Sequence, residues 1–124
     1  MKNRIIAILL ALLCISTVLC GCAKEADSTE KNITVEVVDD KGEKTTYTHT
    51  TTADVLSEAM DEISELSYKL SEDDMIIEVN GLQAIYAEDR AYWAIFVNDT
   101  YGNYGVKDQK LADGDTYRLE YTNA

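Results

Sequence analysis

The stretch that decides the fold is Tyr92-Trp93-Ala94-Ile95-Phe96-Val97-Asn98, which runs on through the loop 99–107 to the closing segment 113–121. It contains the only Trp, the only Phe and five of the eight Tyr of the chain. Each aromatic side chain buries about 150 to 250 Å², so such a group forms either a core or a ligand site. The patterns in the rest of the sequence indicate which of these aromatic residues belong to a core and which to a ligand site.

Residues 92–98 have the pattern of a central strand, because apolar side chains fall on both of its faces. One face carries Trp93, Ile95 and Val97, and the other carries Tyr92, Ala94 and Phe96. The segment 116–121 instead alternates apolar and polar residues, which predicts one covered and one solvated face. The alternation of Trp93 with Ile95 and Val97 favours a place in the core.

The first 21 residues have the pattern of a secretory signal peptide. Lys2 and Arg4 precede an apolar run over 5–13, and Gly21 stands before Cys22. This end resembles the bacterial lipobox, in which the cysteine is diacylglyceryl-modified on sulfur, acylated with palmitate-type chains and becomes the mature N-terminus. We therefore expect a lipoprotein signal peptide over 1–21, with an uncleaved anchor over 5–21 as the alternative.

The charge and the cysteine content of the mature chain disfavour several classes of partner and site. The full chain carries −12, and removal of Lys2 and Arg4 leaves 9 − 23 = −14. Such a charge disfavours nucleic acid and anionic lipid, which are recognised by Lys and Arg. All three Cys lie within residues 1–22, so the domain has no disulfide, thiolate metal site or cysteine nucleophile. We expect an extracytoplasmic protein held on the cell membrane by lipid on Cys22.

The order of elements predicts an α+β domain over 33–124, joined to the lipid by a polar tether over 22–32. A strand over 33–37, a turn over 39–42 and a return strand over 43–50 form a hairpin. A helix over 53–66 with a cap at 51–54, a polar connection over 68–74, a strand over 75–79 and an Asn80-Gly81 turn follow. This order fits a β-grasp-like mixed sheet with one amphipathic helix packed across it.

The predicted helix has an apolar and an acidic face. Its apolar residues are Val55, Leu56, Ala59, Met60, Ile63 and Leu66, and its acidic residues are Glu58, Asp61, Glu62 and Glu65. The acidic face is expected to be solvated, because a carboxylate metal site would need further oxygen ligands from elsewhere. We therefore predict no metal site.

Catalytic residues are hard to find in this chain. His49 is the single His, it lies among threonines, and no nucleophile-elbow or zinc-type spacing is present. We expect His49 to be a surface strand residue that no further group orients. The protein is therefore predicted not to be an enzyme; the alternative is a hydrolase with two carboxylates, for which the acids show no pattern.

Four segments carry a resemblance to a known family: Val79-Asn80-Gly81-Leu82, the strand 92–98, Gly105-Val106-Lys107-Asp108, and Leu111-Ala112-Asp113-Gly114-Asp115. They resemble the transcobalamin-like C-terminal domain, also called domain of unknown function 4430, over roughly residues 33–121. In the vertebrate carriers of that family the domain is a β-grasp-like lid over one face of cobalamin.

The resemblance implies a binding module for a soluble small molecule, cobalamin or another corrinoid, that is accessory to uptake through a membrane transporter. Tyr92 and Trp93 match the aromatic–Trp pair of the family, and Gly105, Val106 and Asp108 match its glycine-to-aspartate step.

Two further tyrosines extend this predicted contact surface. Tyr101 and Tyr104 are expected on a mobile loop, because the neighbouring Gly102 and Gly105 make its backbone flexible. Their rings either lie flat on a planar ligand or cover a small core. The alternative function is a surface domain that binds a protein or glycan, with an exposed edge strand adding a partner strand.

Overall fold

The computed structural model describes residues 29–124. The predicted signal peptide, Cys22 and most of the predicted tether lie outside these residues. Among the residues described, no helix combines the length and the apolar composition that crossing a membrane requires.

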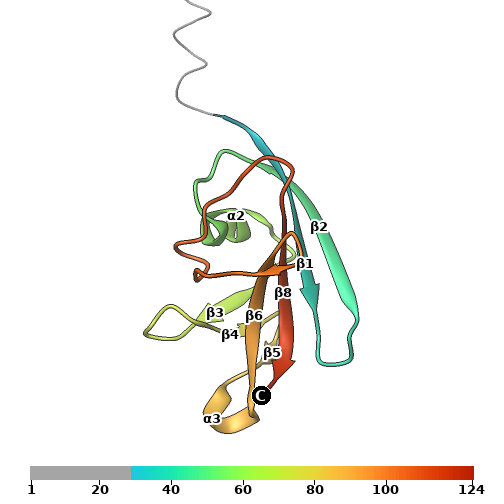
Figure 1. The fold of residues 1–124 in the computed structure, drawn as a ribbon, viewed down its shortest axis with the longest axis vertical. Helices are drawn as coiled ribbons and strands as arrows, with labels where there is room; N and C mark the ends of the chain where they lie inside the picture. Colours follow the sequence, from blue (N-terminus) through green and yellow to red (C-terminus); the bar gives the residue numbers. More distant parts are fainter. Residues whose placement is uncertain (1–28) are drawn as a thin grey trace, which may run out of the picture.

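Two sheets and two short helices make up the domain (Figure 1). The elements in chain order are β1 (Lys31–Val38), β2 (Lys44–Thr51), α2 (Leu56–Glu62), β3 (Tyr68–Leu70), β4 (Ile76–Val79), β5 (Leu82–Gln83), α3 (Tyr86–Asp89), β6 (Ala91–Val97), β7 (Thr100–Tyr101) and β8 (Thr116–Asn123). The larger sheet has the order β2-β1-β8-β6-β7 and the smaller one β3-β4-β5. Only β1 and β8 pair in parallel, so the predicted α+β class with a mixed, β-grasp-like sheet is confirmed.

The first hairpin forms as predicted but begins earlier. β1 and β2 pair without interruption from Lys31 opposite Thr51 to Val38 opposite Lys44. Strand β1 therefore starts two residues before the predicted Ile33, and the polar tether ends at residue 30. The side chain of Asp39 closes the turn, because its Oδ1 accepts the backbone N–H groups of Lys41 and Glu43, both at 2.9 Å.

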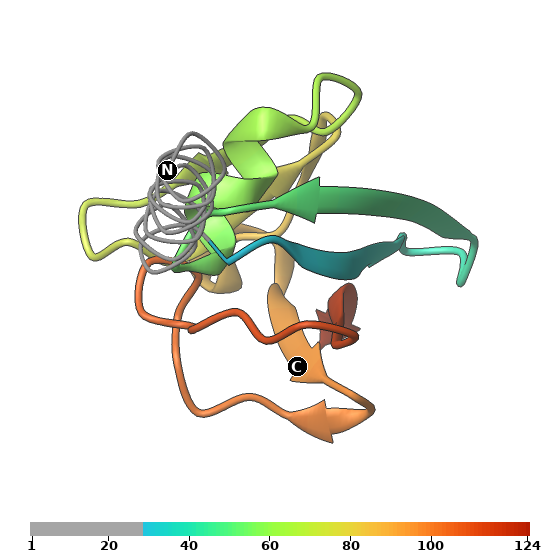
Figure 2. The same cartoon turned by 90° about the horizontal axis from the view of Figure 1, so that it is seen from above.

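The core lies on one face of the larger sheet, where α2 and the smaller sheet both pack (Figures 1 and 2). Its fully buried large side chains are Ile33, Val35, Leu56, Met60, Val79, Val106, Tyr117 and Leu119. The helix contributes the apolar face that the sequence predicts, since Leu56, Ala59, Met60, Ile63 and Leu66 are all buried. The central strands β1, β8 and β6 are thus covered on one side, and the residues that alternate with their core residues lie on the other side.

The helix is shorter than predicted and its predicted cap is wrong. α2 covers Leu56–Glu62 instead of 53–66, and the N-cap residue Val55 makes no side-chain capping bond. The carbonyls of Gln109 and Val106 accept the N–H groups of Leu56 and Ser57 instead, both at 2.9 Å. A helix start needs acceptors for its free N–H groups. Here a distant loop supplies them, which no local pattern could indicate.

The smaller sheet differs from the sequence prediction in one strand and agrees in another. The predicted polar connection 68–74 contains β3, which pairs with β4. The predicted Asn80-Gly81 turn joins β4 to β5, and its positive φ angles of 49° and 83° match a two-residue hairpin turn. β3 is too short and too polar to be recognised without its partner strand. The short helix α3, between β5 and β6, is likewise absent from the sequence prediction.

Part of the predicted loop 99–107 is a strand. Asn98 and Asp99 have positive φ angles of 49° and 67°, and they turn the chain so that β7 pairs antiparallel with β6. Phe96 lies opposite Tyr101 in this pairing. Asn and Asp tolerate the left-handed conformation better than other residues with a Cβ atom, which explains the turn at this place.

Candidate functional site

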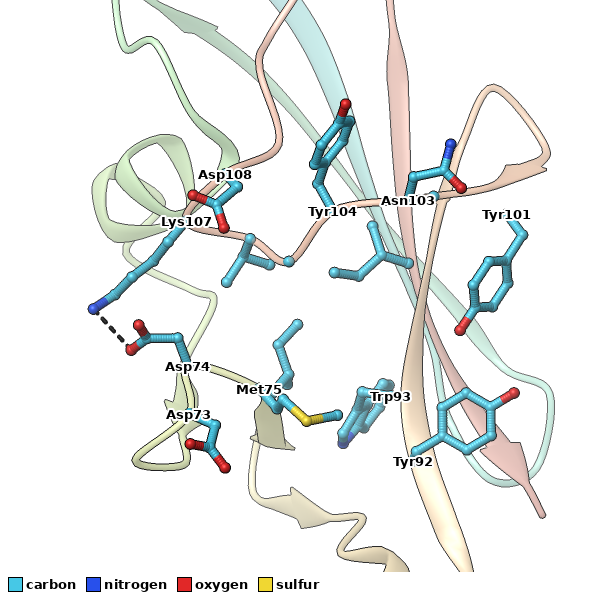
Figure 3. Close-up of a pocket in the computed structure, with 15 residues that line it drawn as sticks. Asp73, Asp74, Met75, Tyr92, Trp93, Tyr101, Asn103, Tyr104, Lys107 and Asp108 are labelled. Atoms are coloured by element: carbon cyan, nitrogen blue, oxygen red, sulfur yellow. Dashed lines mark ion pairs between the residues drawn. The ribbon is translucent and has the colours of Figure 1, made fainter.

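A pocket of about 440 Å³ opens between the β3–β4 turn, β6 and the segment that follows β7 (Figure 3). We call it the β6 pocket. Its lining residues are 73–76, Tyr92, Trp93, Ile95 and 101–108. The two walls come from segments about thirty residues apart in the chain, and β6 lies between them.

The floor of the β6 pocket is apolar and rigid. Trp93 is only 6% exposed, and its indole N–H donates to the carbonyl of Leu82 at 3.1 Å. The indole also meets the ring of Tyr121 edge-on, with centroids 5.7 Å apart. Ile76 and Val106 are buried beside it. The predicted core position of Trp93 is confirmed, and the indole lines the pocket as well.

Two strongly exposed hydrophobic side chains, Met75 and Tyr104, border the mouth of this pocket, and a third, Tyr101, lines it from the other face of β6 (Figure 3). Within residues 29–124, four large hydrophobic side chains are strongly exposed: Met75 at 64%, Tyr104 at 60%, and Tyr86 and Tyr101 at 58% each. Three of these four border the β6 pocket, and Tyr86 does not. Figure 3 shows Met75 turned toward Trp93. Exposed apolar surface that gathers in one place marks an interaction site.

The predicted aromatic contact surface is divided between two faces of the sheet. Trp93 and Tyr92 are neighbours on β6, so their side chains point to opposite faces. Tyr101 packs edge-on against Phe96, at 5.6 Å between ring centroids. Figure 3 accordingly shows Tyr92 and Tyr101 on the other side of β6 from Met75 and Trp93, and Tyr104 at the rim with its ring directed away from Met75.

The segment from Gly105 to Asp108 forms a turn that contacts the start of α2. The carbonyl of Gly105 accepts the N–H groups of Asp108 and Gln109, at 3.1 and 2.9 Å, and so closes a turn. The Val106 carbonyl holds the start of α2, and its side chain is fully buried. The N–H of Leu111 then donates to Asp54 at 3.0 Å. The second half of the predicted mobile loop is therefore tied to α2 by its backbone, while Tyr101 belongs to β7.

Acidic side chains dominate the polar part of the β6 pocket. Lys107 Nζ lies 3.0 Å from Asp74 Oδ1 and so joins the two walls (Figure 3). Both side chains are about half exposed, so this ion pair contributes less than about 1 kcal/mol to stability. With Asp73 and Asp108 the lining charge is 1 − 3 = −2. This charge opposes an anionic ligand.

His49 lies outside the pocket, and its environment differs from the prediction. Its Nε2 is 2.7 Å from Glu62 Oε1, so a group on α2 does orient the ring. The Thr51 hydroxyl donates to the same carboxylate oxygen at 2.7 Å. The Thr51 hydrogen bond first, and then His49, hold the pKa of Glu62 below its ordinary value. No local pattern indicates this trio, because it forms only when α2 packs beside β2.

Several lining residues were not predicted as site residues. Met75 and Ile76 belong to a predicted strand, and Asp73 and Asp74 to a predicted polar connection. The one local signal is an exposed Met directly after two acids. Within residues 29–124, no three Asp, Glu, His or Cys side chains gather in a way that would hold a metal ion.

Two solved structures share this fold. A candidate metal binding protein from Ruminococcus gnavus ATCC 29149 matches with a TM-score of 0.66 at 21% identity, over 76% of this chain and 98% of that protein. Haptocorrin in complex with Cbi matches with a TM-score of 0.68 at 15% identity, over 77% of this chain and 26% of haptocorrin. This chain thus spans about a quarter of the length of haptocorrin. At these identities the likeness concerns the fold alone.

A family model covers most of the described domain. No curated protein matches the chain. The model described as "Domain of unknown function (DUF4430)" matches residues 51–123, which are 123 − 51 + 1 = 73 of the 124 residues. The match includes both helices, the whole smaller sheet, β6, β7, β8 and every residue that lines the β6 pocket. The chain therefore belongs to the DUF4430 family.

Proposed function

We propose that this protein is a non-catalytic binding module that holds a small molecule in the β6 pocket. The observation that carries the proposal is the position of Met75, the most exposed large hydrophobic side chain of residues 29–124, which is turned toward the buried indole of Trp93 in a concave surface with the exposed Tyr104 at its rim (Figure 3). A volume of about 440 Å³ lies within the range of small-molecule sites, about 300 to 1,000 Å³. An apolar floor with a few polar groups at the rim is also typical of such sites.

The ligand proposed is a corrinoid, bound by one edge or one face. Support comes from the fold, which haptocorrin shares in a structure that contains Cbi (cobinamide). The pocket has Trp93 in its floor and Tyr104 at its rim (Figure 3), so it suits part of a large flat molecule. The lining charge of −2 favours a neutral or cationic corrinoid over one that carries a phosphate group.

The arrangement around His49 supports a non-catalytic role. A His–carboxylate pair acts in catalysis when a nucleophile lies within hydrogen-bond reach of the imidazole. The nearby hydroxyl of Thr51 donates to Glu62 and accepts the N–H of Ala53 at 2.9 Å, so it is engaged elsewhere. The His49–Glu62 pair instead fastens the end of α2 to β2.

The place of action proposed is the outer face of the cell membrane, where a membrane transporter would receive the ligand. Lipid on Cys22 would hold the chain there, as the lipobox pattern indicates. Because β1 begins at Lys31, residues 22–30 form the tether and reach at most about 30 Å. The binding domain would therefore remain close to the membrane surface.

Titration of the full-length protein in detergent with cobinamide and with cobalamin tests the proposed ligand. Trp93 is the only Trp and lines the pocket, so its fluorescence should report binding, and equilibrium dialysis provides a second readout. We expect Met75→Ala and Tyr104→Ala to weaken binding about fivefold each, since one apolar contact contributes about 1 kcal/mol.

The matched control is Tyr86→Ala, which removes an equally exposed tyrosine away from the pocket and should leave the affinity unchanged. If neither corrinoid binds at millimolar concentration, the proposal that the ligand is a corrinoid is wrong. Binding that none of the pocket variants alters would instead place the site elsewhere.

A further inference from the structure

The outer edge of the larger sheet is formed by β2, and it is unusually long. β2 has eight residues and pairs with β1 along its whole length without a bulge. The other edge strand of this sheet, β7, has two residues, and the edge strands of the smaller sheet, β3 and β5, have three and two. Figure 1 shows β2 at the margin of the molecule, with no described element beside its outer edge.

The register shows which backbone groups face outward from β2. Asp39 donates its N–H to the carbonyl of Glu43, and hydrogen-bonded and non-bonded pairs then alternate along the hairpin. The backbone N–H of Thr34 donates to the carbonyl of Asp115, so it points toward β8 and away from β2. Thr34 and Thr48, which lie opposite each other, therefore exchange no backbone hydrogen bonds. The backbone N–H and C=O groups of Thr46, Thr48 and Thr50 therefore face away from β1.

This edge lacks the features that keep sheet edges apart. Natural edge strands are short, bulged, covered, or interrupted by proline and charged side chains. The chain has no proline, and apart from His49 the one charged side chain of β2 is Lys44, at the turn end of the strand. Lys44 itself contacts Glu36 on β1, at 3.2 Å. The outward groups are thus free to pair with another strand.

The charge pattern points to a second copy of this chain as the partner. The chain carries 23 acidic residues and a net charge of −12, so two copies repel each other over most of their surfaces. β2, with the sequence KTTYTHTT, contains no acidic residue. Among the edge strands it is the longest without an acidic residue, so it can approach a second copy along eight residues without bringing carboxylates of the two strands together, and its row of threonines is self-complementary.

We propose that two copies pair antiparallel through β2, joining two five-stranded sheets into one of 5 + 5 = 10 strands. The outward groups allow a register with the two-fold axis at Thr48. Thr48 then lies opposite Thr48 of the second copy, and Thr46 opposite Thr50. Threonine pairs across strands are favourable, and Lys44 faces the uncharged Thr52 of the second copy, so no like charges meet.

The pairing buries only one strand edge from each copy, far less than the roughly 800 Å² per partner of a standard stable interface. The dimer is therefore weak in dilute solution. Attachment of both copies to one membrane raises their local concentration and populates it. The two β6 pockets lie at the far ends of the joined sheet, so this surface is independent of ligand binding.

Oxidative cross-linking of the full-length protein in isolated membranes tests the dimer. Thr48→Cys should form a disulfide-linked dimer with copper phenanthroline, because Cα atoms of a hydrogen-bonded antiparallel pair are about 5.5 Å apart, within disulfide range. The matched control is Thr100→Cys, an exposed threonine on the opposite edge strand, which should remain at the background of the unmodified chain.

The register has its own test. Thr46→Cys and Thr50→Cys should not cross-link alone, and should do so when the two variants are expressed together. Thr48→Asp places two carboxylates opposite each other, and it should abolish energy transfer between labelled copies on vesicles while the circular dichroism spectrum stays unchanged.

Three results would overturn the proposal. The first is equal cross-linking of Thr48→Cys and Thr100→Cys, which random collisions would produce. The second is the absence of any cross-linked dimer. The third is a disulfide from Thr48→Cys to a different protein, which would assign this edge to a foreign strand.

Discussion

Trp93 belongs both to the core and to the candidate site. Its indole is buried, donates to Leu82 and still lines the β6 pocket. Its neighbour Tyr92 has the opposite orientation, because side chains alternate along a strand. A contact surface that contains both side chains on one face is therefore excluded by the strand itself, although the two residues are adjacent in the sequence.

Glu62 provides a prediction on pH dependence. Its folded-state pKa lies below the ordinary value of 4.5, so the folded protein binds this proton more weakly than the unfolded chain. The resulting stabilisation is complete above pH 4.5 and is lost as the pH falls through the folded-state pKa. Because the side chain is 45% exposed, we expect a contribution of less than about 1 kcal/mol.

Urea unfolding at neutral pH and at about pH 3 measures this contribution. Glu62→Gln should lose less stability on acidification than the unmodified protein, because glutamine has no proton to gain. Thr51→Val should have an intermediate effect, since it removes one of the two hydrogen bonds and leaves His49 in place. Equal acid sensitivity of all three proteins would contradict the assignment.

At the scale of elements, α2 depends on a segment more than forty residues away. Its apolar spacing predicts the buried face correctly, but its start is set by the carbonyls of Val106 and Gln109. The same segment forms one wall of the β6 pocket. Displacement of α2 from the sheet would therefore disturb the candidate site, even though no residue of the helix lines it.

Leu56→Ala tests the importance of this helix. Leu56 is fully buried, and truncation of such a side chain costs about 2 to 5 kcal/mol of unfolding free energy. Glu58→Ala, on the exposed side of the same helix, should change it by less than about 0.5 kcal/mol. Urea denaturation followed by circular dichroism measures both. A cost below about 1 kcal/mol for Leu56→Ala would show that α2 contributes little to the core.

At the scale of the whole molecule, the proposed lipid anchor determines how the domain is presented. Cys22→Ser should remove the modification, and the protein should then be recovered as an unprocessed precursor or in the soluble fraction. Membrane fractionation, a gel-shift assay for processing and labelling with a fatty-acid analogue measure this. Normal processing and membrane retention of Cys22→Ser would contradict lipidation at this residue.

Much of the fold could be predicted from short-range patterns. A hairpin pattern identified β1 and β2, apolar side chains on both faces identified β6, and alternation identified β8. Helical spacing identified the buried face of α2, and the Asn80-Gly81 pair identified a hairpin turn. These signals are local because backbone geometry gives strands a period of two residues and helices a period of 3.6. The predicted mixed, β-grasp-like sheet followed from their order.

The sequence by itself determined the aromatic strand, the acidic charge and the lipobox pattern at Cys22. Tertiary structure alone decided that β3 is a strand, that loop 105–111 caps α2, and that Met75 meets Trp93 across a pocket. These features depend on atoms from distant segments. The hydrophobic effect brings these segments together by burying their apolar faces, and it depends neither on direction nor on separation in the sequence. A local pattern therefore cannot encode them.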